Sequence, residues 1–208
     1  DTPPEGSFMI NGGSLSTNDQ RVNLDFSLTD DLSGVSSVCL SETDDASTCT
    51  SQDYTPSTTW TFSNESEGEK TLYVWATDGA GNVVTSSTAA SIIFDRTAPV
   101  DGAVDVTANA DSIDFSWSGF ADTLSSVAQY YVSYNLDGSD PESCFGDVTT
   151  ETSDISLQQQ GITADFSYVF RICAEDGAGN ISTGTMVTTA LCVEEQDWYA
   201  DSDADGYG

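Results

Sequence analysis

Two stretches of the chain end in the same five residues. Residues 72–82 read LYVWATDGAGN and residues 170–180 read FRICAEDGAGN, so the copies lie 98 residues apart. Each is a run of strand-forming side chains that leads into Asp-Gly-Ala-Gly-Asn. Gly supplies positive φ in a tight turn, and Asp and Asn favour turns. A repeat at about the length of one small domain predicts two tandem domains.

The repeat extends upstream of the turn. Residues 24–35 read LDFSLTDDLSGV and residues 113–127 read IDFSWSGFADTLSSV, each an alternating run followed by an acidic loop. Ile113, Phe115 and Trp117 alternate with polar residues, a period of two that is typical of antiparallel strands with one buried face. No long window shows a period of 3.6. We therefore expect an all-β fold of two tandem β-sandwiches with almost no helix.

The junctions between domains also repeat. Asp1-Thr-Pro-Pro opens the chain, and Asp95-Arg-Thr-Ala-Pro precedes the second copy. We expect one sandwich over 1–98, a second over 99–192 and an acidic tail over 193–208. Strands are expected near 6–11, 21–29, 35–41, 57–63, 70–77, 83–94, 102–108, 111–118, 128–136, 144–149, 153–158, 166–175 and 182–190.

These motifs resemble two known families. Residues 1–98 resemble a bacterial Ig-like domain, whose strand F ends in Ala-Thr-Asp-x-x-Gly-Asn. Residues 99–192 resemble a fibronectin type III domain of bacterial secreted proteins, with Trp117 at the strand B tryptophan and Tyr168 at the strand F tyrosine. SDPESC and FRICAEDGAGN match a subtype that bears cysteines. The resemblance implies the fold but little about function, because such sandwiches have many functions.

Charge is the extreme feature of the composition. Asp and Glu number 35 against 4 Lys and Arg, a formal net charge of -31. This charge repels nucleic acid and anionic membrane, attracts cations, and is also a common adaptation for solubility. The chain contains no His, which removes His-based general bases and zinc ligands. No apolar run is long enough to cross a membrane.

Five cysteines are spread along the chain without a CxxC pair, which fits an oxidising compartment. Cys39 and Cys49 flank one turn and are expected to form a disulfide. Three pairings are open to Cys144, Cys173 and Cys192. We favour Cys144–Cys173, because alternation places Cys173 on an outward face that the loop carrying Cys144 can cover, and the resembling subtype has cysteines at both positions. The alternative is buried free thiols. Cys192 would then be left over, and its partner is expected in sequence C-terminal to residue 208.

The tail contains the pattern D-x-D-x-D-G, with Asp201, Asp203 and Asp205 at alternate positions. Calcium takes six to eight oxygen ligands, which carboxylates in a tight loop can supply. The pattern resembles the start of a thrombospondin type 3-like calcium repeat whose last ligand would fall beyond residue 208. The alternative is a solvated acidic linker. We therefore expect the chain to be part of a longer protein.

A second acidic group is expected where the B–C loop, the F–G turn and the preceding linker meet at one end of each domain. The candidate calcium ligands are Asp1, Asp30, Asp31, Asp78 and Asn82 in the first domain and Asp95, Asp122, Asp176 and Asn180 in the second. The resemblance to tandem Ig-like adhesin domains implies that such ions stiffen a rod. The alternative is that these residues only form turns.

The sequence favours a structural or adhesive spacer of a secreted or cell-surface protein, held by calcium and disulfides. Its partners would be neighbouring domains of the same protein and a cell-surface protein or glycan. One alternative is a carbohydrate-binding accessory module of a secreted hydrolase, with Tyr73 and Trp75 facing outward to contact glycan. Another is a subunit of an extracellular filament. An enzyme is not expected, because two small sandwiches offer no deep cleft and no nucleophile–base pair.

Overall fold

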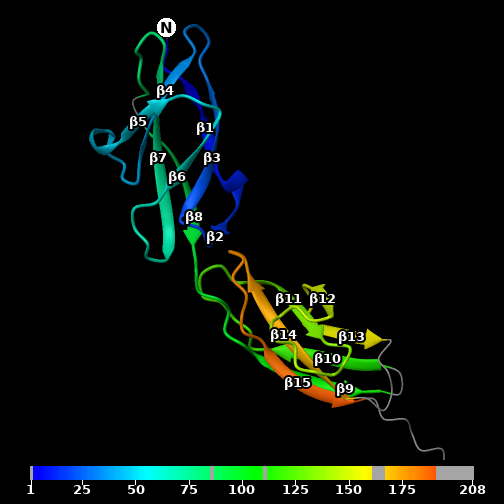
Figure 1. Cartoon of the computed structure of the whole chain (residues 1–208). Coiled ribbons are helices and arrows are strands. Elements are labelled where there is room, and N and C mark those ends of the chain that lie inside the picture. Colours follow the sequence, from blue (N-terminus) through cyan, green and yellow to red (C-terminus); the bar gives the residue numbers. More distant parts are fainter. Residues whose placement is uncertain (1, 85–86, 110–111, 161–166, 191–208) are drawn as a thin grey trace, which may run out of the picture. The chain divides into compact units, whose positions relative to one another are not determined.

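The computed structural model describes residues 2–84, 87–109, 112–160 and 167–190 (Figure 1). Regular structure there consists of strands and two three-residue 3₁₀ turns, η1 (Asn11–Gly13) and η2 (Ala46–Thr48). The expected all-β fold is confirmed. No helix among the described residues is long and apolar enough to span a membrane.

The first sandwich is built from a three-stranded sheet, β1-β3-β6, and a five-stranded sheet, β2-β8-β7-β4-β5. Its strands are β1 (Glu5–Ile10), β2 (Ser16–Thr17), β3 (Arg21–Thr29), β4 (Val35–Ser41), β5 (Thr50–Asp53), β6 (Ser57–Thr61), β7 (Gly68–Asp78) and β8 (Thr88–Phe94). All pairs are antiparallel except β2 with β8. The sequence did not predict β2 and β5, because both are short and polar and show no apolar alternation.

The apolar side chains of the alternating segments fill the core of this sandwich. Val22, Leu24 and Phe26 of β3 point inward and are at most 7% exposed. Leu72 and Val74 of β7 join the same cluster from the opposite sheet. Each such side chain contributes roughly 1.5–3 kcal/mol on burial. The core therefore comes from the inward faces of the two sheets, as the period of two predicts.

The second sandwich pairs a three-stranded sheet, β13-β10-β9, with a four-stranded sheet, β12-β11-β14-β15. Its strands are β9 (Ala103–Ala108), β10 (Ser112–Ser118), β11 (Val127–Tyr134), β12 (Val148–Thr152), β13 (Ser156–Gln160), β14 (Ser167–Asp176) and β15 (Thr185–Ala190). The segment expected as a strand at 144–149 is a loop up to residue 147, and β12 begins at Val148.

Aromatic rings dominate the core of the second sandwich. Phe115 of β10 packs on Phe170 of β14 with ring centroids 4.7 Å apart. Tyr134 contacts both Phe170 and Tyr168, at 4.9 and 5.6 Å. Trp117 is 3% exposed, and its buried indole N–H has no hydrogen-bond partner. Tilted and edge-on ring pairs add stabilisation beyond area burial.

The chain divides into two compact units, and the division does not follow the two sandwiches completely. The first unit comprises the residues up to Pro99 together with Asp122–Ala128 and Glu175–Ile181. The second comprises Val100–Ala121, Gln129–Ala174 and the residues from Ser182 onward. The β10–β11 loop and the turn after β14 therefore belong to the first unit by their contacts.

Candidate metal centre

The repeated Asp-Gly-Ala-Gly-Asn turns have the same internal hydrogen bonds. Asp176 Oδ1 accepts the backbone N–H groups of Ala178 and Asn180 at 2.9 and 2.8 Å. Asp78 makes the corresponding bonds at 2.9 and 2.7 Å. Both aspartates are 2% exposed, and the fourth turn residue has φ of 89° in each copy. The turn buries a carboxylate and satisfies it largely from its own backbone.

The loops after β3 and β10 are organised in the same way by one aspartate each. Asp122 Oδ1 accepts the backbone N–H groups two, three and four residues later, at 2.8, 2.8 and 3.2 Å. Asp30 Oδ1 accepts the corresponding groups at 3.3, 2.8 and 2.7 Å. In both loops one carboxylate oxygen fixes the backbone, and the other oxygen remains for further contacts.

Asp95, which follows β8 directly, is the most deeply buried carboxylate among the described residues, with 0% exposure. Its Oδ1 accepts the Thr97 backbone N–H at 3.0 Å, and its Oδ2 accepts the Ser125 hydroxyl at 2.7 Å. Its carbonyl oxygen accepts the Asn180 side-chain amide at 2.9 Å. All these donors are neutral, so none of them offsets the negative charge.

Asp95, Asp122 and Asp176 converge within the first unit. One carboxylate oxygen from each lies within 4.8 Å of the others, and no other group of three acidic or metal-ligating side chains comes together among the described residues. Burial, with the charges of Asp122 and Asp176, raises the pKa of Asp95 above its ordinary value. Burial also acts on Asp122, but its hydrogen bonds to backbone N–H groups outweigh it and lower the pKa of that carboxyl.

The donor set fits a hard divalent cation. Three carboxylates supply three oxygens with three negative charges, and calcium accepts carboxylate, carbonyl and water oxygens in flexible geometry. A bound cation would offset the repulsion among charges that the neutral donors leave uncompensated. The described residues of this centre include no thiol or imidazole that would favour a softer metal.

The asparagines of the two turns face the carboxylates through their nitrogen atoms. Asn82 Nδ2 donates to Asp78 Oδ2 at 2.7 Å, and Asn180 Nδ2 donates to Asp176 Oδ2 at 2.9 Å. These bonds brace each turn. The carboxylates are therefore the ligands that the geometry offers, and the asparagines hold them in place.

The first domain's own candidate residues do not form a matching group of three among the described residues. Asp78 is buried and Asp31 is exposed. Asp30 Oδ2 is buried without a hydrogen-bond partner, and a cavity of about 250 Å³ is lined by Asp30, Asp31 and Glu5. The remaining candidates, Asp1, Asp201, Asp203 and Asp205, lie outside the described residues, as does Cys192.

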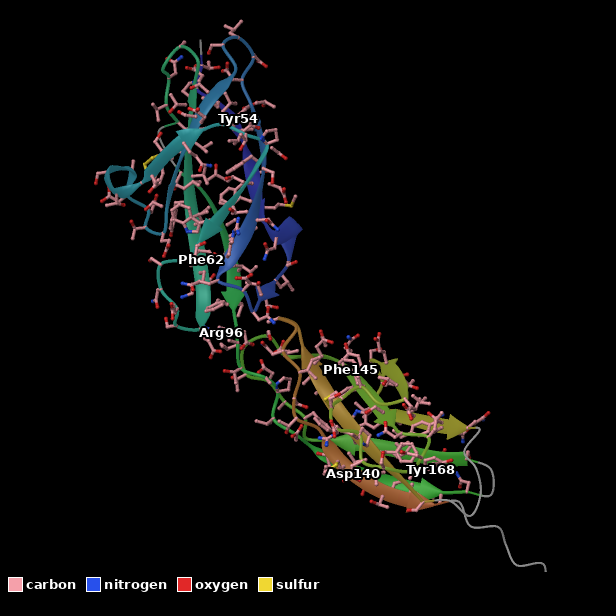
Figure 2. All side chains as sticks on the ribbon, in the orientation of Figure 1. Tyr54, Phe62, Arg96, Asp140, Phe145 and Tyr168 are labelled. Carbon is pink, nitrogen blue, oxygen red and sulfur yellow. A yellow bond between two sulfur atoms is a disulfide. The ribbon has the colours of Figure 1, made fainter. Side chains whose placement is uncertain are left out.

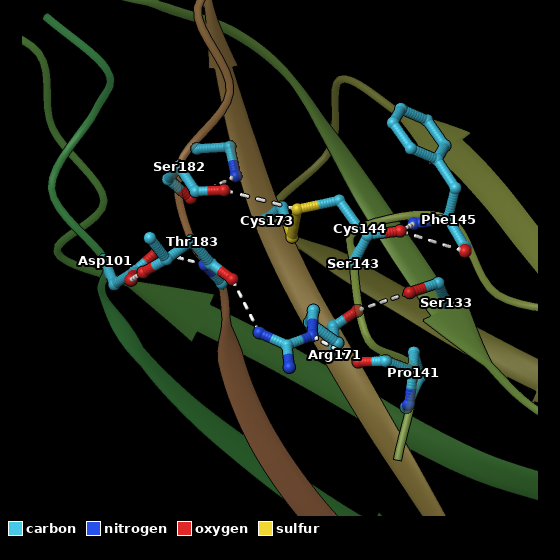
Figure 3. The surroundings of a disulfide bond; sticks show 12 residues. Asp101, Ser133, Pro141, Ser143, Cys144, Phe145, Arg171, Cys173, Ser182 and Thr183 are labelled. Carbon is cyan, nitrogen blue, oxygen red and sulfur yellow. Dashed lines mark hydrogen bonds between the residues drawn. A yellow bond between two sulfur atoms is a disulfide. The ribbon is translucent and has the colours of Figure 1, made fainter. Parts of the chain in front are cut away.

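Both expected disulfides are present. Cys39 bonds to Cys49 with Cα atoms 5.4 Å apart. Cys144 bonds to Cys173 with Cα atoms 5.9 Å apart (Figure 3). Cys173 is 0% exposed although it lies on the outward face of β14, because the loop carrying Cys144 covers that face, as the alternation predicted.

The expectation that Trp75 faces solvent is wrong. Trp75 is only 7% exposed, whereas Tyr73 is half-buried. The register pairs Trp75 with Cys39, so the two side chains are neighbours on one face of the sheet. The Cys39–Cys49 disulfide lies on this face, and Trp75 therefore packs beside it. Figure 2 shows the side chains around this sheet.

The chain is similar to solved fibronectin type III-like modules. No family model and no curated protein matches it. One similar structure contains fibronectin(III)-like modules of Clostridium thermocellum CbhA, with a TM-score of 0.50 and 14% identity over 89% of this chain and 94% of that chain. Another contains the FN1–FN3 domains of chicken CNTN1, with a TM-score of 0.54 and 13% identity over 91% and 68%. The fold is fibronectin type III-like and Ig-like. At these identities the likeness shows the fold alone.

Proposed function

We propose that the chain is a non-catalytic spacer of a secreted or cell-surface protein, stiffened by calcium and by its two disulfides. The observation that carries the proposal is the convergence of Asp95, Asp122 and Asp176 within 4.8 Å of one another. Tandem sandwiches joined by a short linker are well suited to hold another part of a protein at a distance.

Calcium would act on the segments that carry the three carboxylates. Asp95 follows β8, Asp122 lies in the β10–β11 loop and Asp176 begins the turn after β14. The bonds from Ser125 and Asn180 to residue 95 already hold these segments together. An ion shared by the three carboxylates would add stronger, charge-based interactions between these segments and would hold Asp95 in place.

The disulfides support the extracellular part of the proposal. Bridges persist in oxidising compartments and are rare in the cytosol. Each bridge here ties a loop to a strand of a central sheet: Cys49 to β4 and Cys144 to β14. Both therefore stabilise loops against local opening and proteolysis.

Calorimetric titration of the chelator-treated chain with calcium tests the proposal. We expect measurable heat with a dissociation constant of about 10⁻⁴–10⁻³ M, typical of extracellular modules. Melting curves should shift upward with calcium. Absence of both heat and shift would refute the calcium part. Titration with magnesium is the matched control, because magnesium demands a smaller octahedral site and dehydrates reluctantly.

A further inference from the structure

The loop Asn135–Asp147, between β11 and β12, is fixed to the second sandwich at its ends and in its middle. Asn135 Oδ1 accepts the Asp147 backbone N–H at 3.2 Å. Cys144 is bonded to β14 through the disulfide. Arg171, also on β14, donates from Nε to a carbonyl of the loop at 2.9 Å (Figure 3). Side chains on this loop are therefore presented on a pre-ordered backbone, which lowers the entropy lost on binding.

Two large apolar side chains of this loop are exposed. Leu136 is 62% exposed and Phe145 is 54% exposed. The Phe145 ring meets Tyr131 edge-on, with centroids 5.1 Å apart, so contact with the sheet restrains its position while much of it remains in solvent. Figure 2 labels Phe145 on the second sandwich. Rigid aromatic side chains of this kind are the usual anchors of protein interfaces.

Several carboxylates lie close to these apolar side chains, either within the same loop or on the neighbouring strand β12. Glu151 of β12 pairs with Tyr131, whose ring contacts Phe145. The acidic residues within the loop are Asp137, Asp140, Glu142 and Asp147. Arg171 is the one basic residue after Arg96 in the chain. Its guanidinium donates hydrogen bonds to the carbonyl oxygens of Pro141 and Thr183 within the fold. We call these five carboxylates the acidic rim, and their negative charge is available to a partner.

We propose that the loop 135–147 is a docking surface for a cationic protein segment that carries an apolar pocket or apolar side chains. Phe145 and Leu136 supply the apolar anchors, and the acidic rim attracts Lys and Arg of the partner. A second copy of this chain would present the same acidic rim and is repelled. A neutral glycan would gain nothing from these carboxylates, so charge complementarity favours a basic protein.

Chemical-shift mapping on the full chain tests the proposal with three short synthetic peptides. One combines lysine with tryptophan, one lysine with serine, and one glutamate with tryptophan. We expect the lysine–tryptophan peptide to perturb amides of residues 135–151 selectively and to bind about tenfold or more tightly than the other two. Phe145→Ala should weaken its binding about tenfold or more.

Leu32→Ala is the matched control, because Leu32 is 79% exposed and follows Asp30 and Asp31. It should leave the affinity unchanged. Phe145→Ala should retain the wild-type spectrum elsewhere, which shows that it folds. Equal binding by the lysine–serine peptide, equal affinity of wild type and Phe145→Ala, or perturbations spread over all acidic surfaces would each overturn the proposal. Selective perturbation of the same amides by cello-oligosaccharides would assign the surface to sugar instead. These readouts are independent of calcium binding at Asp95.

Discussion

Replacing Asp95 with asparagine should raise the stability of the chain without calcium and abolish most of the stabilisation that calcium gives. The side chain is fully buried, and its carboxylate lies within 4.8 Å of those of Asp122 and Asp176. Asparagine has the same shape. Its Oδ1 can still accept the Thr97 backbone N–H, and its Nδ2 can donate to the Ser125 hydroxyl. The substitution therefore removes one charge while keeping the packing and the hydrogen bonds.

The size of both changes in the free energy of unfolding can be estimated from the charge repulsion and from calcium binding. Asp95 faces two like charges, on Asp122 and Asp176, within 4.8 Å. Each pair repels by about 1 kcal/mol at the dielectric constant of water and by about 3 kcal/mol at an effective value near 20. Without calcium, Asp95→Asn removes both repulsions and should raise the free energy of unfolding by about 2 kcal/mol or more at neutral pH. With calcium at about 100 times its dissociation constant, the wild type should gain about 2.7 kcal/mol. That gain corresponds to about 5–10 °C in Tm, and the variant should gain little of it.

Thermal unfolding of wild type and Asp95→Asn, each with calcium and with chelator, measures both effects. Asp105→Asn is the matched control, because Asp105 is an exposed carboxylate on β9. It should leave the calcium shift intact. A lower Tm of Asp95→Asn in chelator, together with an unchanged calcium shift, would show that Asp95 is a structural hydrogen-bond acceptor and not a ligand.

Three further predictions concern pH, a disulfide and a buried ring. The raised pKa of Asp95 means that, without calcium, its contribution to stability is present below its unfolded pKa and is lost as pH rises through the folded pKa. Calcium affinity should conversely fall as pH falls through that value, and a pH-independent titration would contradict this. Replacing Cys144 and Cys173 together by Ala removes a bridge with a sequence separation of 29. The free energy of unfolding in urea should fall by about 3–4 kcal/mol, and a loss below about 1 kcal/mol would show that the bridge adds little. Trp75→Ala should cost about 3–5 kcal/mol in urea unfolding, clearly more than Tyr73→Ala, and equal costs would show that Trp75 is not packed beside its disulfide.

Much of the fold was predictable because the alternation of apolar and polar residues marks the strands. A strand with one buried face must alternate, so β3, β10 and β14 could be located from Leu24, Phe115 and Phe170 and their polar neighbours. The strands that the sequence did not predict, β2 and β5, are short and polar and bury little. Pairing with a neighbouring strand, and not composition, makes them strands.

The candidate centre was predictable as a set of residues but not as a geometry. Asp95, Asp122 and Asp176 lie far apart in the sequence, and only the chain's path brings their oxygens within 4.8 Å. Ser125, which donates to Asp95, carries no signal in the sequence because serine is common in loops. Asn180, in contrast, was predicted as a ligand from its place in the repeated turn, but the sequence could not show that its nitrogen and not its oxygen faces Asp176.

The amino-acid sequence was enough to predict the all-β class, the repeated turn and the cysteines available for two disulfides. These follow from side-chain period, from backbone conformations that Gly and Asp favour, and from the spacing of thiols. Which acidic residues share a site, and which outward-facing residues are exposed to solvent, depends on how the strands and loops pack in three dimensions. Trp75 and Phe145 show why. Alternation gives the face of the sheet on which Trp75 lies, but not that Trp75, paired with the disulfide-bonded Cys39, is only 7% exposed. Nor does it show that Phe145, next to the disulfide-bonded Cys144, is 54% exposed.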